Sequence, residues 1–212
     1  MVADARLPPR WVPRYATVKH VGDVLVAYLL LLAASPLLLA IAVAILMTMG
    51  GPVLFRQRRI GLHGREIQVW KFRTMMADRR SENRGPPDPN GDRRRRHKSR
   101  CDPRVTPLGR FLRRASLDEL PQLWNVARGD MSLVGPRPEL PSIVAKYEEW
   151  QHARHAVRPG LTGWWQVNRP ADRLMHEVVE LDLYYVQHLS FWLDIRILAK
   201  TVAAVLRGTG AF

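Results

Sequence analysis

The clearest pattern along the chain is an uncharged, mostly apolar stretch from Val24 to Met49, set in a remainder that is rich in charge. Its 26 residues would extend about 39 Å as a straight helix, against a bilayer hydrocarbon core of about 30 Å. The stretch is too long for the apolar core of a cleaved signal peptide. Since the sequence holds no second stretch of this kind, the pattern predicts one membrane-associated helix and disfavours a polytopic membrane protein.

A proline interrupts this helix near its middle. Pro36 cannot donate the amide that would bond the carbonyl of Leu32, and its ring crowds the preceding turn, so a break or sharp kink is expected. Each arm is then only about 18 to 21 Å long. The hydroxyl of Ser35 is placed to satisfy a carbonyl freed at the break, which matters in lipid because no water is available there.

Basic residues flank the apolar stretch equally on its two sides, so the positive-inside rule gives a spanning helix no preferred orientation. The four on each side are Arg6, Arg10, Arg14 and Lys19, then Arg56, Arg58, Arg59 and Arg65. A re-entrant helix that enters and leaves on the cytoplasmic face accommodates both groups, and a kinked single-pass helix is the alternative. The predicted organisation is a basic segment 1–23, a re-entrant helix 24–49 broken at Ser35–Pro36, and a cytosolic catalytic domain 50–212.

The remainder is predicted to be mainly α-helical, with a minor extended element. Residues 66–74 alternate between apolar and polar positions, which indicates a short strand. Residues 79–104 combine proline and glycine with ten basic and four acidic residues, which is typical of a loop. This basic loop is expected either to be solvated or to contact anionic lipid headgroups. Helices are predicted over residues 108–114, 117–127 and 141–156.

The C-terminal stretch 191–206 has the pattern of an amphipathic helix. Its apolar residues recur at intervals of three and four, at Trp192, Ile195, Ala199, Val202 and Leu206. Such a stripe either faces the core of the domain or lies at a membrane interface, and the sequence leaves both alternatives open.

Charge and composition narrow the class of protein. The chain has 33 Lys and Arg against 19 Asp and Glu, so its net charge of +14 indicates an anionic partner: nucleic acid, an acidic membrane surface or a phosphorylated substrate. With 47% hydrophobic residues it is not disordered throughout. Cys101 is its single cysteine and can close no disulfide within the chain, which favours a reducing, cytoplasmic compartment.

Adjacent carboxylates at Asp118 and Glu119 are the strongest candidates for chemistry. Ser116 with Glu119 three residues later has the form of a capping box, and Pro121 indicates that a helix begins close by. The two carboxylates are then in the first helical turn and point about 100° apart. They either cap the helix and complement its dipole, or divide catalytic work between a nucleophile or metal ligand and an orienting partner.

Basic residues suited to phosphate accompany this pair. Lys71, Arg113 and Arg137 lie in segments rigid enough to aim their side chains, and Arg137 is held between Pro136 and Pro138. A carboxylate in a basic pocket beside a membrane indicates phosphoryl chemistry, because an aspartate can be phosphorylated as a covalent intermediate. A divalent ion, usually Mg²⁺, would neutralise the pyrophosphate of a donor substrate.

Seven motifs, in order, make the chain resemble the bacterial sugar transferase family, the monotopic polyprenyl-phosphate phosphoglycosyl transferases, from about Lys19 to its end. They are Ser35-Pro36, Gly51-Pro52-Val53-Leu54-Phe55-Arg56-Gln57, Lys71-Phe72-Arg73-Thr74-Met75, Asp102-Pro103-Arg104-Val105-Thr106, Ser116-Leu117-Asp118-Glu119-Leu120-Pro121-Gln122-Leu123, Gly129-Asp130-Met131-Ser132 leading to Gly135-Pro136-Arg137-Pro138, and Arg158-Pro159-Gly160-Leu161-Thr162-Gly163-Trp164. So many matches in this order are not expected by chance.

The resemblance implies an enzyme that transfers a phosphosugar from a UDP-sugar to polyprenyl phosphate. Asp118 would attack the β-phosphate, release UMP and form a phosphosugar-aspartyl intermediate, from which polyprenyl phosphate takes the phosphosugar. Glu119 would be the partner of the dyad, with Mg²⁺ bound at Asp118 and Glu119. The product would start the assembly of an exopolysaccharide, capsule, O-antigen or glycoprotein glycan.

Position in the matched motifs also implies the substrate-binding residues and the place of action. Lys71, Arg113 and Arg137 would bind phosphate, whereas Arg158 either contacts substrate or has a structural role. The expected location is the cytoplasmic face of the bacterial inner membrane, among anionic lipids, and the expected form is the small one that holds only the catalytic core. The sugar, the glycan pathway and the oligomeric state, a homo-oligomer included, are not specified.

The chain departs from the family pattern in three places. Lys19-His20-Val21-Gly22-Asp23 stands where Lys-Arg-x-Phe-Asp is typical, and Arg169-Pro170 replaces Gly-Arg after Asn168. The polybasic run 93–98 is not part of the family pattern.

Two other classes of function compete with the enzyme. A membrane-attached nucleic-acid-binding protein would explain the positive charge, but no recognition helix or aromatic stacking motif accompanies the basic run. A scaffold without turnover would keep the fold, and the intact pair Asp118 and Glu119 argues against it.

Overall fold

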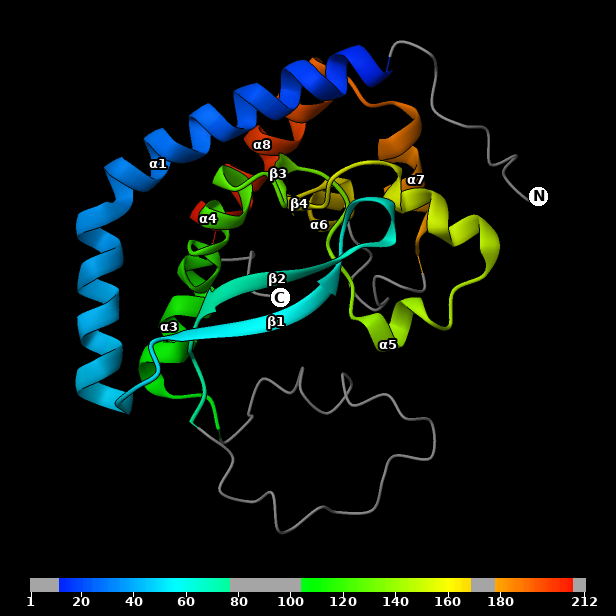
Figure 1. Ribbon diagram of the computed structural model, residues 1–212. Coiled ribbons are helices and arrows are strands. Elements are labelled where there is room, and N and C mark those ends of the chain that lie inside the picture. Colours follow the sequence, from blue (N-terminus) through cyan, green and yellow to red (C-terminus); the bar gives the residue numbers. More distant parts are fainter. Residues whose placement is uncertain (1–11, 77–103, 169–177, 208–212) are drawn as a thin grey trace.

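One long helix wraps a small domain of short helices and two small sheets (Figure 1). The computed structural model describes residues 12–76, 104–168 and 178–207. The helices are α1 (Val12–Met49), α3 (Pro107–Arg114), α4 (Gln122–Ala127), α5 (Pro141–Val144), α6 (Trp164–Asn168), α7 (Glu180–Gln187) and α8 (Phe191–Leu206), with 3₁₀ helices at Leu62–Gly64, Leu117–Glu119 and Glu149–Ala156. The strands β1 (Leu54–Ile60) and β2 (Glu66–Phe72) form an antiparallel hairpin, and β3 (Ser132–Val134) pairs in parallel with β4 (Gly160–Thr162).

The apolar stretch forms the greater part of α1, which bends but does not break. Its helical structure runs through Pro36, and Figure 1 shows two arms that meet at a sharp bend. The hydroxyl of Ser35 donates a 2.8 Å hydrogen bond to the carbonyl of Leu32, the group that Pro36 leaves without an amide. The expected kink and the expected hydrogen bond from Ser35 are therefore confirmed, whereas the helix is not completely broken.

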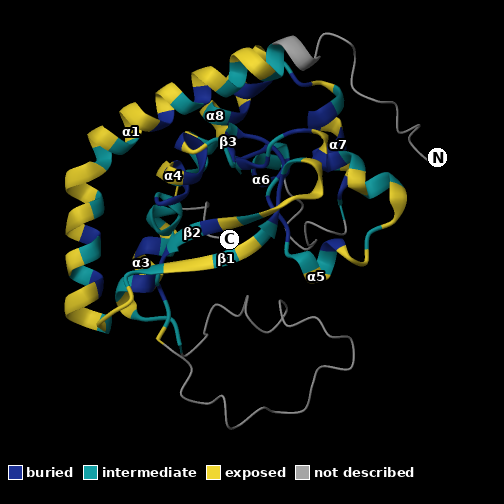
Figure 2. Cartoon of the chain, viewed as in Figure 1, coloured by how far each residue is buried: buried dark blue, intermediate teal, exposed yellow. Residues whose placement is uncertain are grey.

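Much of α1 is exposed on the side that faces away from the domain. Figure 2 shows this outer side as largely exposed along both arms. Apolar side chains such as Leu29, Leu39 and Met47 are more than three fifths exposed, whereas Ala27 and Ile45 on the inner side are fully buried. Within the described residues, α1 is the one helix long and apolar enough to cross a membrane.

Polar contacts fasten both ends of α1 to the same domain. Near its start, Lys19 pairs with Asp194 of α8 at 2.8 Å, and Asp23 accepts a hydrogen bond from the hydroxyl of Ser132 in β3. At its end, the guanidinium of Arg73 donates to the carbonyls of Met49, Gly50 and Gly51. Carbonyls at a helix C-terminus lack intrahelical partners, so Arg73 caps α1 and ties it to the segment after β2.

The strand predicted at residues 66–74 is confirmed as β2, although it ends at Phe72, and its partner β1 was not predicted. The two strands pair in register from Leu54 opposite Phe72 to Ile60 opposite Glu66. Between its two apolar ends, β1 carries mostly polar and charged side chains, so it lacks the alternation by which a strand is predicted.

Two of the helices predicted from sequence are each divided in the structure. The segment 117–127 begins as a 3₁₀ turn and continues as α4, because Pro121 has no amide to extend a helix through it. The segment 141–156 divides into α5 and a 3₁₀ helix, since Glu148 starts the second one with a capping box to Gln151. The helix predicted at 108–114 is confirmed as α3, which begins one residue earlier.

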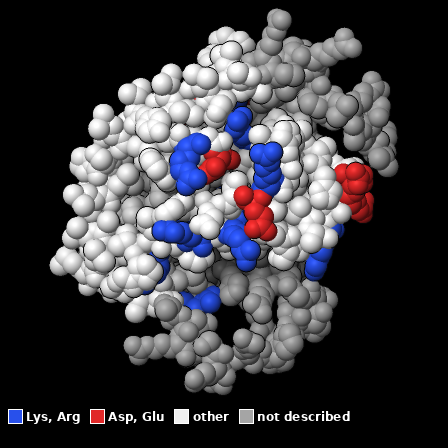
Figure 3. Space-filling view, viewed as in Figure 1, with Lys and Arg blue, Asp and Glu red and all other residues white. Residues whose placement is uncertain are grey.

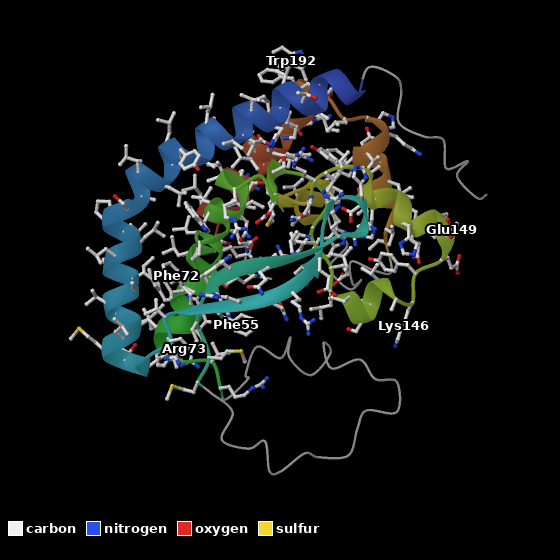
Figure 4. The ribbon with its side chains drawn as sticks, viewed as in Figure 1. Phe55, Phe72, Arg73, Lys146, Glu149 and Trp192 are labelled. Carbon is white, nitrogen blue, oxygen red and sulfur yellow. The ribbon has the colours of Figure 1, made fainter. Side chains whose placement is uncertain are left out.

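Helix α8 has the predicted bounds. The face that packs against the domain is opposite to the apolar stripe identified in the sequence. Leu193 and Ile197 are buried in the core, whereas Trp192, Val202 and Leu206 are 77%, 59% and 82% exposed. Figure 4 shows Trp192 projecting from the molecule beside the first arm of α1. A core-facing role for the stripe from Trp192 to Leu206 is therefore wrong.

The basic loop predicted at 79–104 lies almost entirely outside the described residues, as do Cys101 and the departure at Arg169-Pro170.

Candidate active site

A cavity of about 490 Å³ lies beside the β1–β2 hairpin. Strand β2, helix α3, the 3₁₀ helix Leu117–Glu119 and the loop after β3 all contribute to its walls. It brings together five of the residues predicted from sequence: Lys71, Arg113, Asp118, Glu119 and Arg137. Figure 3 shows Lys and Arg side chains gathered around a few acidic ones on the face seen in this view.

Glu119 is clamped between two cations at the centre of this cavity. The Nζ atom of Lys71 lies 2.6 Å from its Oε1, and Arg137 donates to Oε1 at 2.7 Å and to Oε2 at 3.3 Å. Burial by itself would raise the pKa of the Glu119 carboxyl, but Arg137 and Lys71 hold this pKa well below its usual range. Glu119 is therefore ionised at neutral pH, and it fixes both cations at one point.

Asp118, the neighbouring residue, has no hydrogen-bond or ion-pair partner among the residues that the structure describes. Burial and the nearby negative charge of Glu119 raise the pKa of its carboxyl to about 6. Its oxygens are thus available to a substrate, and the carboxylate is more basic than that of an ordinary aspartate. These are the properties that a nucleophilic carboxylate needs.

The two acids follow a residue whose backbone has the left-handed conformation, and no capping box holds them in place. Ser116 has φ 56° and makes no side-chain capping bond, so the capping box predicted for Ser116 and Glu119 is wrong. The side chain of Glu119 instead binds the cations across the cavity. The tight turn places consecutive carboxylates in different surroundings, which allows one to be paired while the other is left available.

Arg113 reaches the cavity because α3 packs unusually close to the end of β2. A Cβ atom on Gly109 would lie 2.1 Å from the carbonyl oxygen of Thr74, so only glycine permits this approach. One turn further along α3, the Nε of Arg113 donates to the hydroxyl of Thr74 at 2.9 Å. Helix α3 begins at an N-cap, Thr106, whose side chain accepts from the Gly109 amide.

Arg137 projects from a stiff corner formed by residues 135–138. Prolines on both sides restrict its backbone. The Gly135 amide donates to the carbonyl of Thr162 at 2.8 Å, so the corner is attached to the end of β4. The sequence-based expectation that this segment aims Arg137 agrees with the geometry.

Arg158 lies outside this cavity, although its motif matched. It lines a separate cavity of about 170 Å³ together with Lys19 and His20, and its Nε donates to the carbonyl of Gly129 at 3.0 Å. Of the two roles considered for Arg158, the geometry supports the structural one.

Apolar residues that were not predicted as site residues form another wall of the active-site cavity. Pro52, Phe55, Met75 and Met76 line it near the end of α1, and Phe55 and Met76 are about half exposed. Figure 4 shows Phe55 and Arg73 in this part of the molecule, near the last turn of α1. Membership of two matched motifs was the sequence signal for Pro52, Phe55 and Met75, because nothing in their spacing marks them as ligands, and Met76 directly follows the second of these motifs.

No group of three or more His, Cys, Asp or Glu side chains suited to a metal occurs among the described residues. Asp118 offers two oxygens that have no partner within the described part of the chain, whereas both oxygens of Glu119 already face cations. A divalent ion held here would need further ligands from a substrate, which is the usual way in which Mg²⁺ is bound beside phosphates.

Comparison with known proteins gives one consistent result. The family model described as "Bacterial sugar transferase" matches residues 14–208. The chain is 43% identical to "Undecaprenyl-phosphate glucose phosphotransferase" of Komagataeibacter xylinus, over 92% of this chain and 37% of that protein. It is 44% identical to "UDP-glucose:undecaprenyl-phosphate glucose-1-phosphate transferase" of Escherichia coli (strain K12), over 87% of this chain and 39% of that protein.

A shorter relative matches over most of its length. "Uncharacterized sugar transferase EpsL" of Bacillus subtilis (strain 168) is 41% identical, over 91% of this chain and 89% of that protein. By contrast, the chain spans less than two fifths of the two phosphotransferases above.

Proposed function

The chain belongs to the bacterial sugar transferase family, and from this membership we propose that it transfers a sugar phosphate from a UDP-sugar to polyprenyl phosphate. The observation that carries the proposal is the pairing of two unlike carboxylates in one basic cavity. Asp118 is available and has a raised pKa, whereas Glu119 holds Lys71 and Arg137 where phosphate oxygens would approach.

In the first step, a carboxylate oxygen of Asp118 attacks the β-phosphorus of the UDP-sugar. The bond from this phosphorus to the bridging oxygen breaks, and UMP leaves with that oxygen and its electron pair. Lys71, Arg113 and Arg137 neutralise the charge that develops on the phosphate oxygens. The product on the enzyme is a phosphosugar joined to Asp118 as an acyl phosphate.

In the second step, an oxygen of polyprenyl phosphate attacks the same phosphorus. The bond to Asp118 breaks, the carboxylate is restored, and a polyprenyl diphosphosugar is formed. The same cations serve both steps, because each step places the negative charge of a phosphate at the same point. The apolar wall formed by Pro52, Phe55, Met75 and Met76 would suit the first isoprene units of a polyprenyl chain.

Mg²⁺ is the proposed cofactor, and the residues present fit it in part. Asp118 would hold the ion together with phosphate oxygens and water, and Glu119 would act mainly by holding the two cations. When bound, Mg²⁺ supplies charge neutralisation for the pyrophosphate of the donor.

We further propose that α1 is re-entrant and that the domain acts on the cytoplasmic face of the inner membrane. Contacts of Lys19 and Asp23 at one end of α1 and of Arg73 at the other fasten both ends to one small domain. A helix that spanned the bilayer would place these ends on opposite sides. The exposed stripe from Trp192 to Leu206 on α8 is proposed to rest on the membrane surface, and anionic lipids are the proposed neighbours of the basic residues.

The covalent step gives the direct test. Purified protein is mixed with Mg²⁺ and, in turn, UDP-glucose, UDP-galactose and UDP-N-acetylgalactosamine, without polyprenyl phosphate. The expected result with the correct donor is one equivalent of UMP and a mass increase of one phosphosugar, which undecaprenyl phosphate then removes. Asp118→Asn should give neither.

Other outcomes would overturn parts of the proposal. UMP release that requires both substrates at once would indicate direct transfer without the aspartyl intermediate. A chain that releases no UMP from any UDP-sugar, with or without undecaprenyl phosphate, would be a scaffold.

A further inference from the structure

A buried ion pair outside the cavity holds the segment that carries Arg137. Arg154, in the 3₁₀ helix Glu149–Ala156, is 1% exposed, and Asp182, in the first turn of α7, is fully buried. The two side chains form an ion pair, and Arg154 also donates to the hydroxyl of Tyr147 at 2.6 Å. From this fixed position the same guanidinium donates to the main-chain carbonyl of Arg137 at 2.7 Å.

Donors from outside help to hold the corner at residues 135–138. Pro136 and Pro138 have no amide hydrogen, so the corner has few hydrogen bonds of its own to hold its shape. The carbonyl of Pro136 accepts from the Gly160 amide at 2.9 Å, and the carbonyl of Arg137 accepts from Arg154. The hydrogen bond from Arg154 thus holds the main chain of Arg137, the residue whose side chain lines the cavity.

A guanidinium suits this task because its donors have a fixed planar arrangement. Asp182 and the hydroxyl of Tyr147 each bind the guanidinium of Arg154 and so fix its orientation. In this orientation one of its N–H groups points toward the carbonyl of Arg137. A displacement of about 1 Å at Arg137 would separate its guanidinium from Glu119 and from a bound phosphate, and can cost about 100-fold in rate.

We propose that Arg154, oriented by Asp182, is a positioning residue of the transferase: it fixes the main chain at Arg137 and thereby the cation that meets the substrate phosphate. This inference rests on the proposed function, since it requires Arg137 to bind substrate. It assigns a role in the reaction to a pair that touches neither Asp118 nor Glu119.

The alternative is that the pair only stabilises the packing of α7. To separate the two, the affinity for UDP is measured by calorimetry, and kcat/KM and Tm are measured on the same samples. The variants are Arg154→Met, which leaves Asp182 buried without its cation, and Arg154→Met with Asp182→Asn, which removes both charges. Because an uncompensated buried charge is the main cost of the first, the second should regain most of the lost Tm.

Positioning predicts that the double variant regains Tm but keeps a UDP affinity about 10- to 100-fold below that of the unaltered chain. A packing role predicts that Tm and affinity recover together, which would overturn the inference. In an Arg137→Ala background, Arg154→Met with Asp182→Asn should change the remaining UDP affinity by less than about threefold, because its effect passes through Arg137. An equal loss in both backgrounds would also contradict the inference.

Arg128→Met is the matched control, since Arg128 forms an exposed pair with Asp130 away from the cavity and should leave all three quantities unchanged. If the unaltered chain binds no UDP, the proposed function fails. If it binds UDP and the double variant binds it equally well, only the positioning role fails.

Discussion

Arg137 donates to both carboxylate oxygens of Glu119, at 2.7 Å and 3.3 Å, from a loop 18 residues further along the chain. Lys71 approaches the same carboxylate at 2.6 Å from strand β2. One acid thus gathers two cations from separate elements, and the adjacent Asp118 is left available for chemistry. The two carboxylates should therefore respond differently when each is replaced by its amide.

Glu119→Gln should weaken both the fold and the site. The substitution leaves Lys71 and Arg137 facing each other without a negative charge between them, in surroundings where their side chains are 20% and 18% exposed. We expect a loss of about 2 kcal/mol in the free energy of unfolding and at least about a 100-fold fall in kcat/KM. Thermal unfolding and UMP release measure the two effects. An unchanged Tm would show that the cations do not need Glu119.

Asp118→Asn should have the opposite effect on stability. The pKa of Asp118 is raised from 3.8 to about 6, so between these pH values the folded chain binds more protons than the unfolded chain. Stability therefore falls as pH rises through this window, and at pH 7 the buried carboxylate costs on the order of 1–3 kcal/mol. The Asn variant should unfold at a higher Tm at pH 7, and the difference should shrink toward pH 4. A variant that is less stable than the unaltered chain at pH 7 would contradict the raised pKa.

The rate of the first step should decline in acid. A protonated Asp118 cannot attack phosphorus, so kcat/KM for the UDP-sugar should fall tenfold per pH unit below a pKa of about 6. The measurement is UMP release across pH 4.5 to 8 under substrate-limiting conditions. A profile that stays flat down to pH 4.5 would indicate that Asp118 has the pKa of an ordinary aspartate.

Gly109→Ala should disturb Arg113 from a distance. The added Cβ would lie 2.1 Å from the carbonyl oxygen of Thr74, so α3 or the end of β2 must move, and Arg113 is hydrogen-bonded to Thr74. We expect a loss of about 2 kcal/mol in stability and about a tenfold loss in kcat/KM. Gly22→Ala is the control, because a Cβ at Gly22 meets nothing within 4 Å. If Gly109→Ala and Gly22→Ala lowered stability and kcat/KM equally, the close approach of Gly109 to Thr74 would not be the cause.

The re-entrant arrangement of α1 can be tested with single cysteines at positions 14 and 58 in a Cys101→Ser background. A membrane-impermeant maleimide should label neither position in intact spheroplasts and both in inside-out vesicles. Labels on opposite sides would show that α1 is a single-pass helix and would leave the chemistry at Asp118 unaffected.

Local sequence determined the features that depend on neighbouring residues. The bounds of α8, the apolar length of α1 and the bonding of Ser35 to Leu32 all follow from periodicity or from the properties of proline, which act within a few residues. The matched motifs added the identity of the acidic pair.

Tertiary structure decided which of these residues meet. Lys71 and Glu119 are 48 residues apart, so no periodicity in the sequence could show that they form an ion pair. Because Glu119 binds cations across the cavity, it does not form the predicted capping box with Ser116. The same holds for β1, whose pairing with β2 compensates for its weak pattern. It holds also for Arg158, because its motif left open whether it contacts substrate, and the fold places it in another cavity. Contacts between distant residues depend on how the whole chain packs, so no single segment of the sequence determines them.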